Sequence, residues 1–183
     1  MTVRGALVTG FVAALLTSFG CGGGDTTPPT LACREEGTAG ANTVSMSCGG
    51  SIDGTTARVV VVIGGPASGT TILRGLNFDV TYDPAKLEFV PADDDYASPL
   101  FPDALVLVAL ANQQQGRVVA AIQQLGTLPD VAVATGEHDV LSLSFRRVAA
   151  ATFGPTPLTF DRAQATAASP AISFANGLVL EYP

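Results

Sequence analysis

The sequence predicts an all-β domain built as a two-sheet β-sandwich of eight or nine short strands. Apolar and polar residues alternate in several short segments, most clearly at residues 76–82, and this period of two is typical of strands with one buried face. Gly and Pro interrupt the chain about every 8 to 12 residues, which leaves no room for long helices. Sheets with one apolar face pack those faces together, which favours a sandwich.

Each expected strand follows from its own pattern. Strict alternation predicts strands at residues 76–82, 141–145, 158–160 and 172–174. Residues 59–63 are apolar throughout and β-branched, which predicts a strand buried on both faces. Residues 105–108 are also apolar throughout. Because residues 104–115 are rich in helix formers as well, a helix is the alternative there, and we expect a strand.

Asp83 and Pro84 predict a tight turn after the strand at 76–82. An Asp side chain accepts hydrogen bonds from the N–H groups that such a turn exposes, and Pro has no N–H to lose. Leu87 then reaches the core. We therefore expect these residues to fix the strand register and not to bind a ligand.

The first 20 residues predict a signal peptide. Arg4 precedes an apolar run at residues 6–16 that is too short to span a bilayer, and small residues precede Cys21. This start resembles bacterial lipoprotein export signals, in which Cys21 becomes the lipidated first residue, and residues 21–32 then form a flexible linker. The resemblance implies an exported lipoprotein, periplasmic or at the cell surface, held to a membrane only by its lipid. Plain secretion with Cys21 free is the alternative.

Cys33 and Cys48 predict a disulfide in an oxidising compartment. It closes a loop of roughly 15 residues, which contributes about 3 kcal/mol in the chain-entropy model. A metal site is the alternative, but two Cys this far apart and a single distant His are a weak signal. We expect residues 33–55 to form a disulfide-closed segment and residues 56–183 to form the sandwich domain.

Composition excludes several function classes. A net charge of −7 opposes nucleic-acid binding. No Gly-x-Ser-x-Gly elbow or phosphate loop occurs. Glu137, His138 and Asp139 have acid–base side chains, but neighbours in an extended chain point to opposite faces. Residues 93–95 are three consecutive Asp, whereas calcium loops space their carboxylates, so we expect a solvated loop. We therefore expect no catalytic residue, no metal and no cofactor.

The order of these segments resembles the cohesin family, nine-stranded jelly-roll modules that bind dockerin domains. The likeness covers residues 56–183, and its most specific element is the turn Tyr82-Asp83-Pro84. The segments that carry it are residues 76–90, 117–122, 140–145 and 172–179. The resemblance implies jelly-roll topology with about nine strands and a non-catalytic protein–protein binding module with a dockerin-like partner.

The resemblance also implies a binding face, because cohesins use one face of the sandwich to bind a helical, calcium-loaded dockerin. Gly75 shares the outward parity of this face, and Leu125 stands where an acidic contact is common. A solvated face without a partner is the alternative. The expected contact residues are Asn77, Asp79, Thr81, Ala121 and Gln123.

Carbohydrate binding is the alternative function, because sugar-binding modules share related sandwich folds. Such modules need exposed aromatic rings, and this chain has no Trp and only Tyr82, Tyr96 and Tyr182. Tyr82 has the parity of a buried residue. A polysaccharide is therefore a less favoured partner than a protein.

Overall fold

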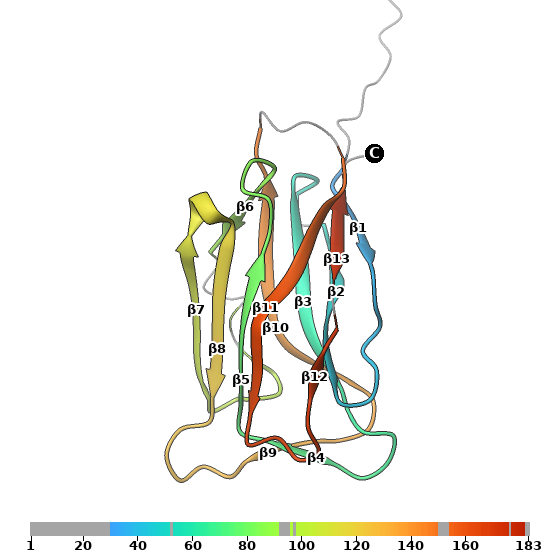
Figure 1. Ribbon diagram of the computed structural model, residues 1–183, viewed down its shortest axis with the longest axis vertical. Helices are drawn as coiled ribbons and strands as arrows, with labels where there is room; N and C mark the ends of the chain where they lie inside the picture. Colours follow the sequence, from blue (N-terminus) through green and yellow to red (C-terminus); the bar gives the residue numbers. More distant parts are fainter. Residues whose placement is uncertain are drawn as a thin grey trace, which may run out of the picture.

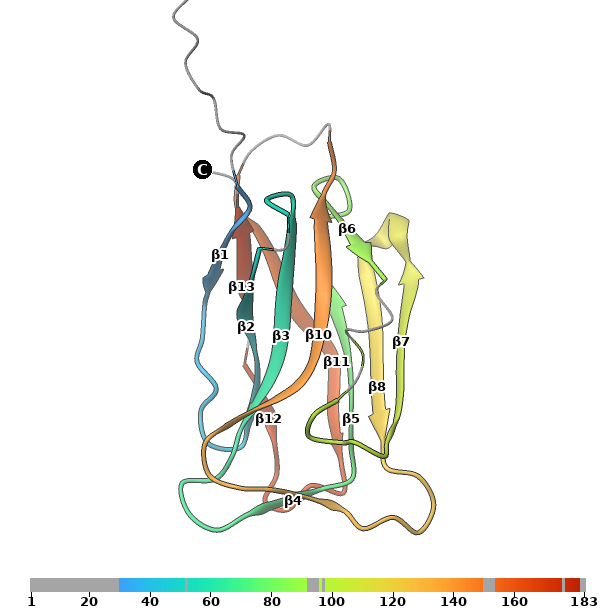
Figure 2. The same cartoon turned by 180° about the vertical axis from the view of Figure 1, so that it is seen from behind.

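The protein is a sandwich of two β-sheets. The computed structural model describes residues 30–51, 53–91, 96, 98–149, 154–175 and 177–181. Their regular structure is strand, apart from single-turn 3-10 segments such as η2 (Gln113–Gln115). The sheets lie in two layers, one behind the other (Figures 1 and 2). The predicted all-β sandwich is therefore confirmed.

The first layer is a six-stranded sheet, nearer the viewer in Figure 1. Its spatial order is β1 (Ala32–Glu35), β13 (Leu178–Glu181), β11 (Thr156–Thr166), β5 (Gly75–Thr81), β8 (Arg117–Gln123) and β7 (Leu105–Asn112). All its pairings are antiparallel.

The second layer is a five-stranded sheet, best seen in Figure 2. Its order is β12 (Ser173–Phe174), β2 (Thr43–Ser51), β3 (Thr56–Gly64), β10 (Glu137–Arg147) and β6 (Leu87–Val90). A separate ribbon of β4 (Thr71–Leu73) and β9 (Val131–Val133) lies at one end of the sandwich. The described residues thus hold thirteen strands where about nine were expected, because strands of two to four residues are too short for alternation to reveal.

The alternating residues form the core between the two sheets. From the six-stranded sheet, Leu76, Phe78 and Val80 point inward and are at most 1% exposed. The edge of the Phe160 ring packs on Phe78 at a centroid distance of 5.3 Å, and Phe145 of the opposite sheet packs on Tyr82 at the same distance. Edge-to-face pairs of this kind add to the free energy gained from apolar burial.

The sandwich begins earlier than the predicted boundary at residue 56. β1 pairs with β13, and β2 pairs with β3 over residues Thr43 to Ser51. Residues 33–55 are therefore part of the two sheets and not a separate closed segment. The sequence hid this because β1 is a short edge strand with charged residues and β2 alternates through small polar Ser.

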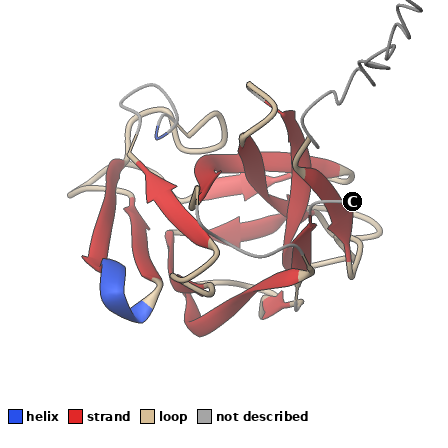
Figure 3. Ribbon diagram, turned by 90° about the horizontal axis from the view of Figure 1, so that it is seen from above, coloured by secondary structure: helices blue, strands red, loops and turns tan. Residues whose placement is uncertain are grey.

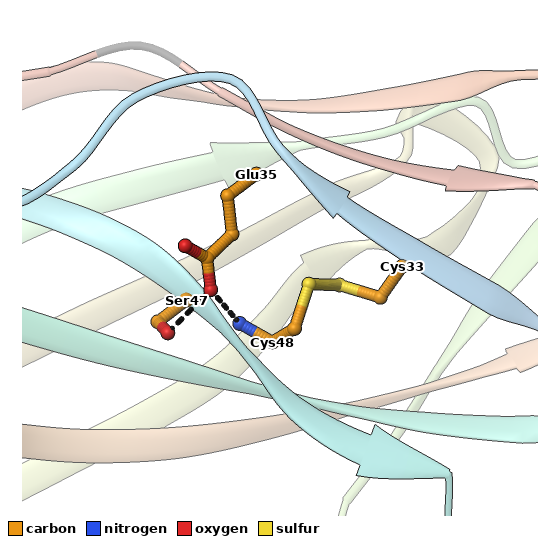
Figure 4. The surroundings of a disulfide bond; sticks show 4 residues. All are labelled: Cys33, Glu35, Ser47 and Cys48. Carbon is orange, nitrogen blue, oxygen red and sulfur yellow. Dashed lines mark hydrogen bonds between the residues drawn. A yellow bond between two sulfur atoms is a disulfide. The ribbon is translucent and has the colours of Figure 1, made fainter.

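The predicted disulfide between Cys33 and Cys48 is confirmed, with its Cα atoms 5.8 Å apart. It joins β1 at the edge of one sheet to β2 inside the other (Figure 4). Glu35 crosses the same gap, because its Oε1 accepts hydrogen bonds from Ser47 Oγ (2.6 Å) and Cys48 N–H (2.8 Å). These bonds, that from Ser47 first, hold the pKa of Glu35 below its ordinary value of 4.5.

The Asp83 turn has the expected geometry. Asp83 Oδ1 accepts a hydrogen bond from Ala85 N–H at 2.9 Å, its carbonyl accepts one from Leu87 N–H, and Leu87 is buried. Gly116 packs against this turn with a φ of +59°, and a Cβ there would lie 2.0 Å from the Tyr82 carbonyl oxygen. Only glycine fits that position.

Several expectations fall on residues that the structure does not describe. The signal peptide at residues 1–20, lipidated Cys21 and most of the linker at 21–32 lie outside the described residues, as do Asp93–Asp95 and Tyr182. Among the helices that are described, none is both long and apolar enough to cross a bilayer.

Candidate protein-binding face

The outward side of the six-stranded sheet is the candidate site. We call the part over β11, β5, β8 and β7 the outer face; these four strands lie side by side (Figure 1). Residues paired across neighbouring antiparallel strands point to the same side. The rows of the outer face are Thr159, Thr81 and Arg117; then Asp161, Asp79, Val119 and Ala109; then Gln164, Asn77, Ala121 and Leu107; and last Thr166, Gly75, Gln123 and Leu105.

All the expected contact residues lie on this face. Asn77 pairs directly with Ala121, and Gln123 lies in the next row opposite Gly75. Asn77, Ala121 and Gln123 are half-buried, as is Thr81, whose hydroxyl hydrogen-bonds that of Thr159 at 2.8 Å. The structure brings the residues together, and their role in binding stays a prediction.

Asp79 differs from the expectation because it is only 4% exposed. The guanidinium of Arg117 covers it, with Nε and Nη2 lying 2.7 and 2.6 Å from Asp79 Oδ2. The side chain is on the outer face, but its charge is already matched by a neighbour. Gly75 is also buried, so it offers no exposed surface either.

Arg162 is a charged residue of this face that sequence reasoning missed. It lies in a β-bulge of β11, where the pairing with β5 shifts between Asp161 and Gln164. Its φ of +48° is in the left-handed region, and bulges of this kind redirect side chains. The Arg162 side chain is 67% exposed, with Nε 3.9 Å from both Asp79 Oδ2 and Asp161 Oδ2. Its guanidinium therefore keeps donors for a further acceptor.

Leu105 and Leu107 on β7 were missed as well. Each is 56% exposed, and their rows place them beside Gln123 and Ala121. The intervening Val106 and Val108 pack against the core. A signal was present, since strand alternation puts residues 105 and 107 on one side, but a run that is apolar throughout does not show which side faces water. The outer face thus has an apolar half over β7 and β8.

The alternative sites gather no chemistry. Glu137, His138 and Asp139 begin β10, where His138 Nε2 lies 3.1 Å from the Ala134 carbonyl oxygen. No cluster of three His, Cys, Asp or Glu suited to a metal occurs among the described residues. Tyr82 is buried, and the half-buried Tyr96 stacks on Phe89 with the ring centroids 6.5 Å apart. Neither described tyrosine provides the exposed platform that carbohydrate binding needs.

Comparison with solved structures identifies this architecture. The sixth cohesin of scaffoldin B from Acetivibrio cellulolyticus, solved in complex with a mutant Cel5 dockerin, matches with a TM-score of 0.55 and 16% identity over 74% of this chain and 95% of its own. The fold is cohesin-like. The predicted resemblance and jelly-roll topology are confirmed. Because identity is low, the likeness concerns the fold of the cohesin-like sandwich.

Two further matches agree with the first. A type II cohesin from the cellulosome of Acetivibrio cellulolyticus has a TM-score of 0.53 and 10% identity over 75% of this chain and 93% of its own. The third ScaC cohesin of that organism, in complex with a ScaB dockerin, has a TM-score of 0.51 and 11% identity over 74% of this chain and 95% of its own. Neither a protein-family model nor a curated protein matches the sequence.

Proposed function

We propose that this chain is a non-catalytic protein-binding module that engages its partner through the outer face. The observation that carries the proposal is the pair of leucines, Leu105 and Leu107, left exposed on the open side of a cohesin-like sheet. Solved proteins with this fold are complexes of cohesins with dockerins. A dockerin-type partner is therefore the first class to test.

The apolar half of the face supplies affinity. Fully burying an exposed leucine contributes about 1.5–3 kcal/mol, so covering the exposed parts of Leu105 and Leu107 contributes roughly 1 kcal/mol each. Ala121, which lies beside Leu107, is small and lets a partner helix approach the sheet closely. The apolar half therefore fits a helix that presents a row of apolar residues.

The charged half of the face supplies orientation. Arg117 is occupied by Asp79, whereas the exposed Arg162 is held only loosely by two carboxylates at 3.9 Å. A guanidinium binds a carboxylate through two parallel hydrogen bonds. A partner with a carboxylate beside its apolar row would thus be held in one orientation.

Export and lipid attachment at Cys21 belong to the same proposal. The disulfide between Cys33 and Cys48 supports export, because such bonds persist in oxidising compartments. Lipidation would keep the module at a membrane while its partner is bound. Mass spectrometry of the protein purified from a bacterial membrane fraction tests this part, and a mature N-terminus without added acyl mass would contradict it.

The binding proposal is tested with the full chain and a panel of purified dockerin modules, by calorimetry with calcium and with a chelator. We expect at least one dockerin to bind in calcium. Ala121→Arg places a large charged side chain in the middle of the outer face and should abolish that binding. Ala132→Arg makes the same change at an exposed position of β9, away from the face, and should leave it intact.

Two results would overturn the proposal. Absence of binding to every dockerin leaves the cohesin-like fold without this partner class. Equal loss of binding in both arginine variants would show that the outer face is not the contact. Circular dichroism of each variant establishes that the sandwich is still folded.

A further inference from the structure

The outer edge of β7 is a free strand edge. β7 ends the six-stranded sheet, and among the described residues only β8 pairs with it. It is the outermost strand on its side in both Figure 1 and Figure 2. Figure 3 shows the same position from above, where η2 marks the turn that joins β7 to β8. In a paired strand, alternate residues direct their N–H and C=O groups away from the neighbour, so this edge presents unpaired backbone groups.

The other sheet edges are short or polar. β12 has two residues and β6 has four. β1 has four residues, includes Arg34 and Glu35, and is tied to the second sheet by the disulfide. β7 has eight. Native proteins protect long edges with charged residues, proline or bulges.

β7 lacks these protections over most of its length. The strand reads Leu-Val-Leu-Val-Ala-Leu-Ala-Asn, without charge or proline. Its pairing with β8 is regular from Leu105 to Leu110, and the register shifts only between Leu110 and Asn112. Six uninterrupted residues of high β-propensity therefore form an edge that another strand can join.

We propose that two copies of this chain pair antiparallel through β7 about a two-fold axis, so that one continuous sheet runs through both. A second copy fits because β7 is neutral, and two copies bring no like charges together along the contact. With the axis at Leu107, each Leu107 faces its counterpart and Leu105 faces Ala109. Apolar pairs of this kind stabilise neighbouring strands.

The pairing closes on itself. A two-fold contact uses the same edge of both copies and leaves no second β7 edge to extend the sheet. The opposite end of the sheet is β1, whose four residues carry charges. The contact therefore gives a dimer and not a filament.

Net charge sets the salt dependence of the dimer. Each chain carries −7, so two copies repel one another at long range, and salt screens that repulsion. The contact itself is neutral and loses nothing to screening. Dimerisation should thus strengthen as salt is raised, whereas an interface held by ion pairs would weaken.

The dimer leaves the outer face accessible. Edge pairing uses backbone groups in the plane of the sheet, while the side chains of the outer face point away from that plane. The two outer faces then lie side by side on one surface. This inference does not depend on the proposed function, because it concerns two copies of the same chain.

Analytical ultracentrifugation of the full chain, in low and high salt, tests the proposal. We expect a monomer–dimer equilibrium that shifts to dimer with concentration and with salt. Leu107→Lys puts two ammonium groups opposite each other at the axis and should weaken the dimer at least about tenfold. Leu125→Lys makes the same change at an exposed leucine after β8 and should leave it unchanged, as should Ala121→Arg on the outer face.

Amide hydrogen exchange identifies the contact. In the dimer, alternate amides between Leu105 and Leu110 should gain protection as concentration rises. A chain that stays monomeric at every concentration and salt would overturn the proposal. So would a dimer that leaves the β7 amides unprotected, or one that Leu107→Lys and Leu125→Lys weaken equally.

Discussion

At the scale of single residues, Arg162 holds a backbone conformation that most residues avoid. Its φ of +48° costs a residue with a Cβ about 1–2 kcal/mol relative to an extended strand. Strain of this kind is often found where a side chain serves a function. Here the bulge projects a guanidinium over the outer face, which is a physical reason for arginine where glycine would be more comfortable.

Replacing Arg162 by glycine should therefore stabilise the fold. Arg162→Ala removes the guanidinium but keeps the strained backbone, whereas Arg162→Gly removes both. We expect the Gly variant to be more stable than the Ala variant by about 1 kcal/mol, measured by urea denaturation. A Gly variant that is the less stable of the two would show that the bulge carries no strain.

Asp79 shows where residue-level prediction stops. Alternation correctly assigns Phe78 to the core and Asp79 to the outer face. It does not indicate that Arg117, 38 positions along the chain, covers the Asp79 carboxylate. That contact depends on the register between β5 and β8, which two separate periodic segments do not specify.

At the scale of elements, the same limit applies to β7 and β1. Residues 105–108 predict a strand, and β7 is one, but a uniformly apolar run carries no information about which side is exposed. β1 is short and charged, so its place in the sheet follows from pairing with β13 and from the disulfide. Both positions come from long-range pairing, whereas the strictly alternating strands are evident from sequence.

The disulfide should govern the stability of β1. Cys33 and Cys48 are 15 positions apart, and replacing both by Ser should lower the free energy of unfolding by about 3 kcal/mol. Amide exchange should show lost protection in β1, while β3 and β10, which pair inside the second sheet, keep theirs. Chemical reduction of the native chain provides an independent comparison. Unchanged protection in β1 would mean that pairing with β13 alone holds the strand.

At the scale of the whole molecule, stability depends on the core that both sheets share. Tyr82 lies in it, 6% exposed, against Phe145 of the other sheet. Burial, with the nearby Glu88 carboxylate, raises the pKa of Tyr82 above its ordinary value of 10.0, although a hydrogen bond with the Phe89 backbone acts in the opposite direction. Ionising this phenol therefore opposes the packing of the two sheets.

This pKa shift predicts a loss of stability in alkali. A group whose folded pKa is raised contributes its full stability below its unfolded pKa and loses it as pH rises through the folded value. The free energy of unfolding should thus decline above about pH 10. Tyr82→Phe keeps the ring and should flatten that decline in urea titrations at successive pH values. An identical decline in the variant would assign the effect to other groups.

The disulfide also determines how the molecule bears tension. Cys33 is the second residue of β1, and Cys48 belongs to β2, which is flanked by β12 and β3. A force pulling on the chain ahead of Ala32 therefore passes through the sulfur atoms into the interior of the second sheet and does not peel β1 from its margin. To detach the loaded strand, the row of backbone bonds between β2 and β3 must give way. A module held by its leading end and gripped on its broad side would resist stretching where it is strongest.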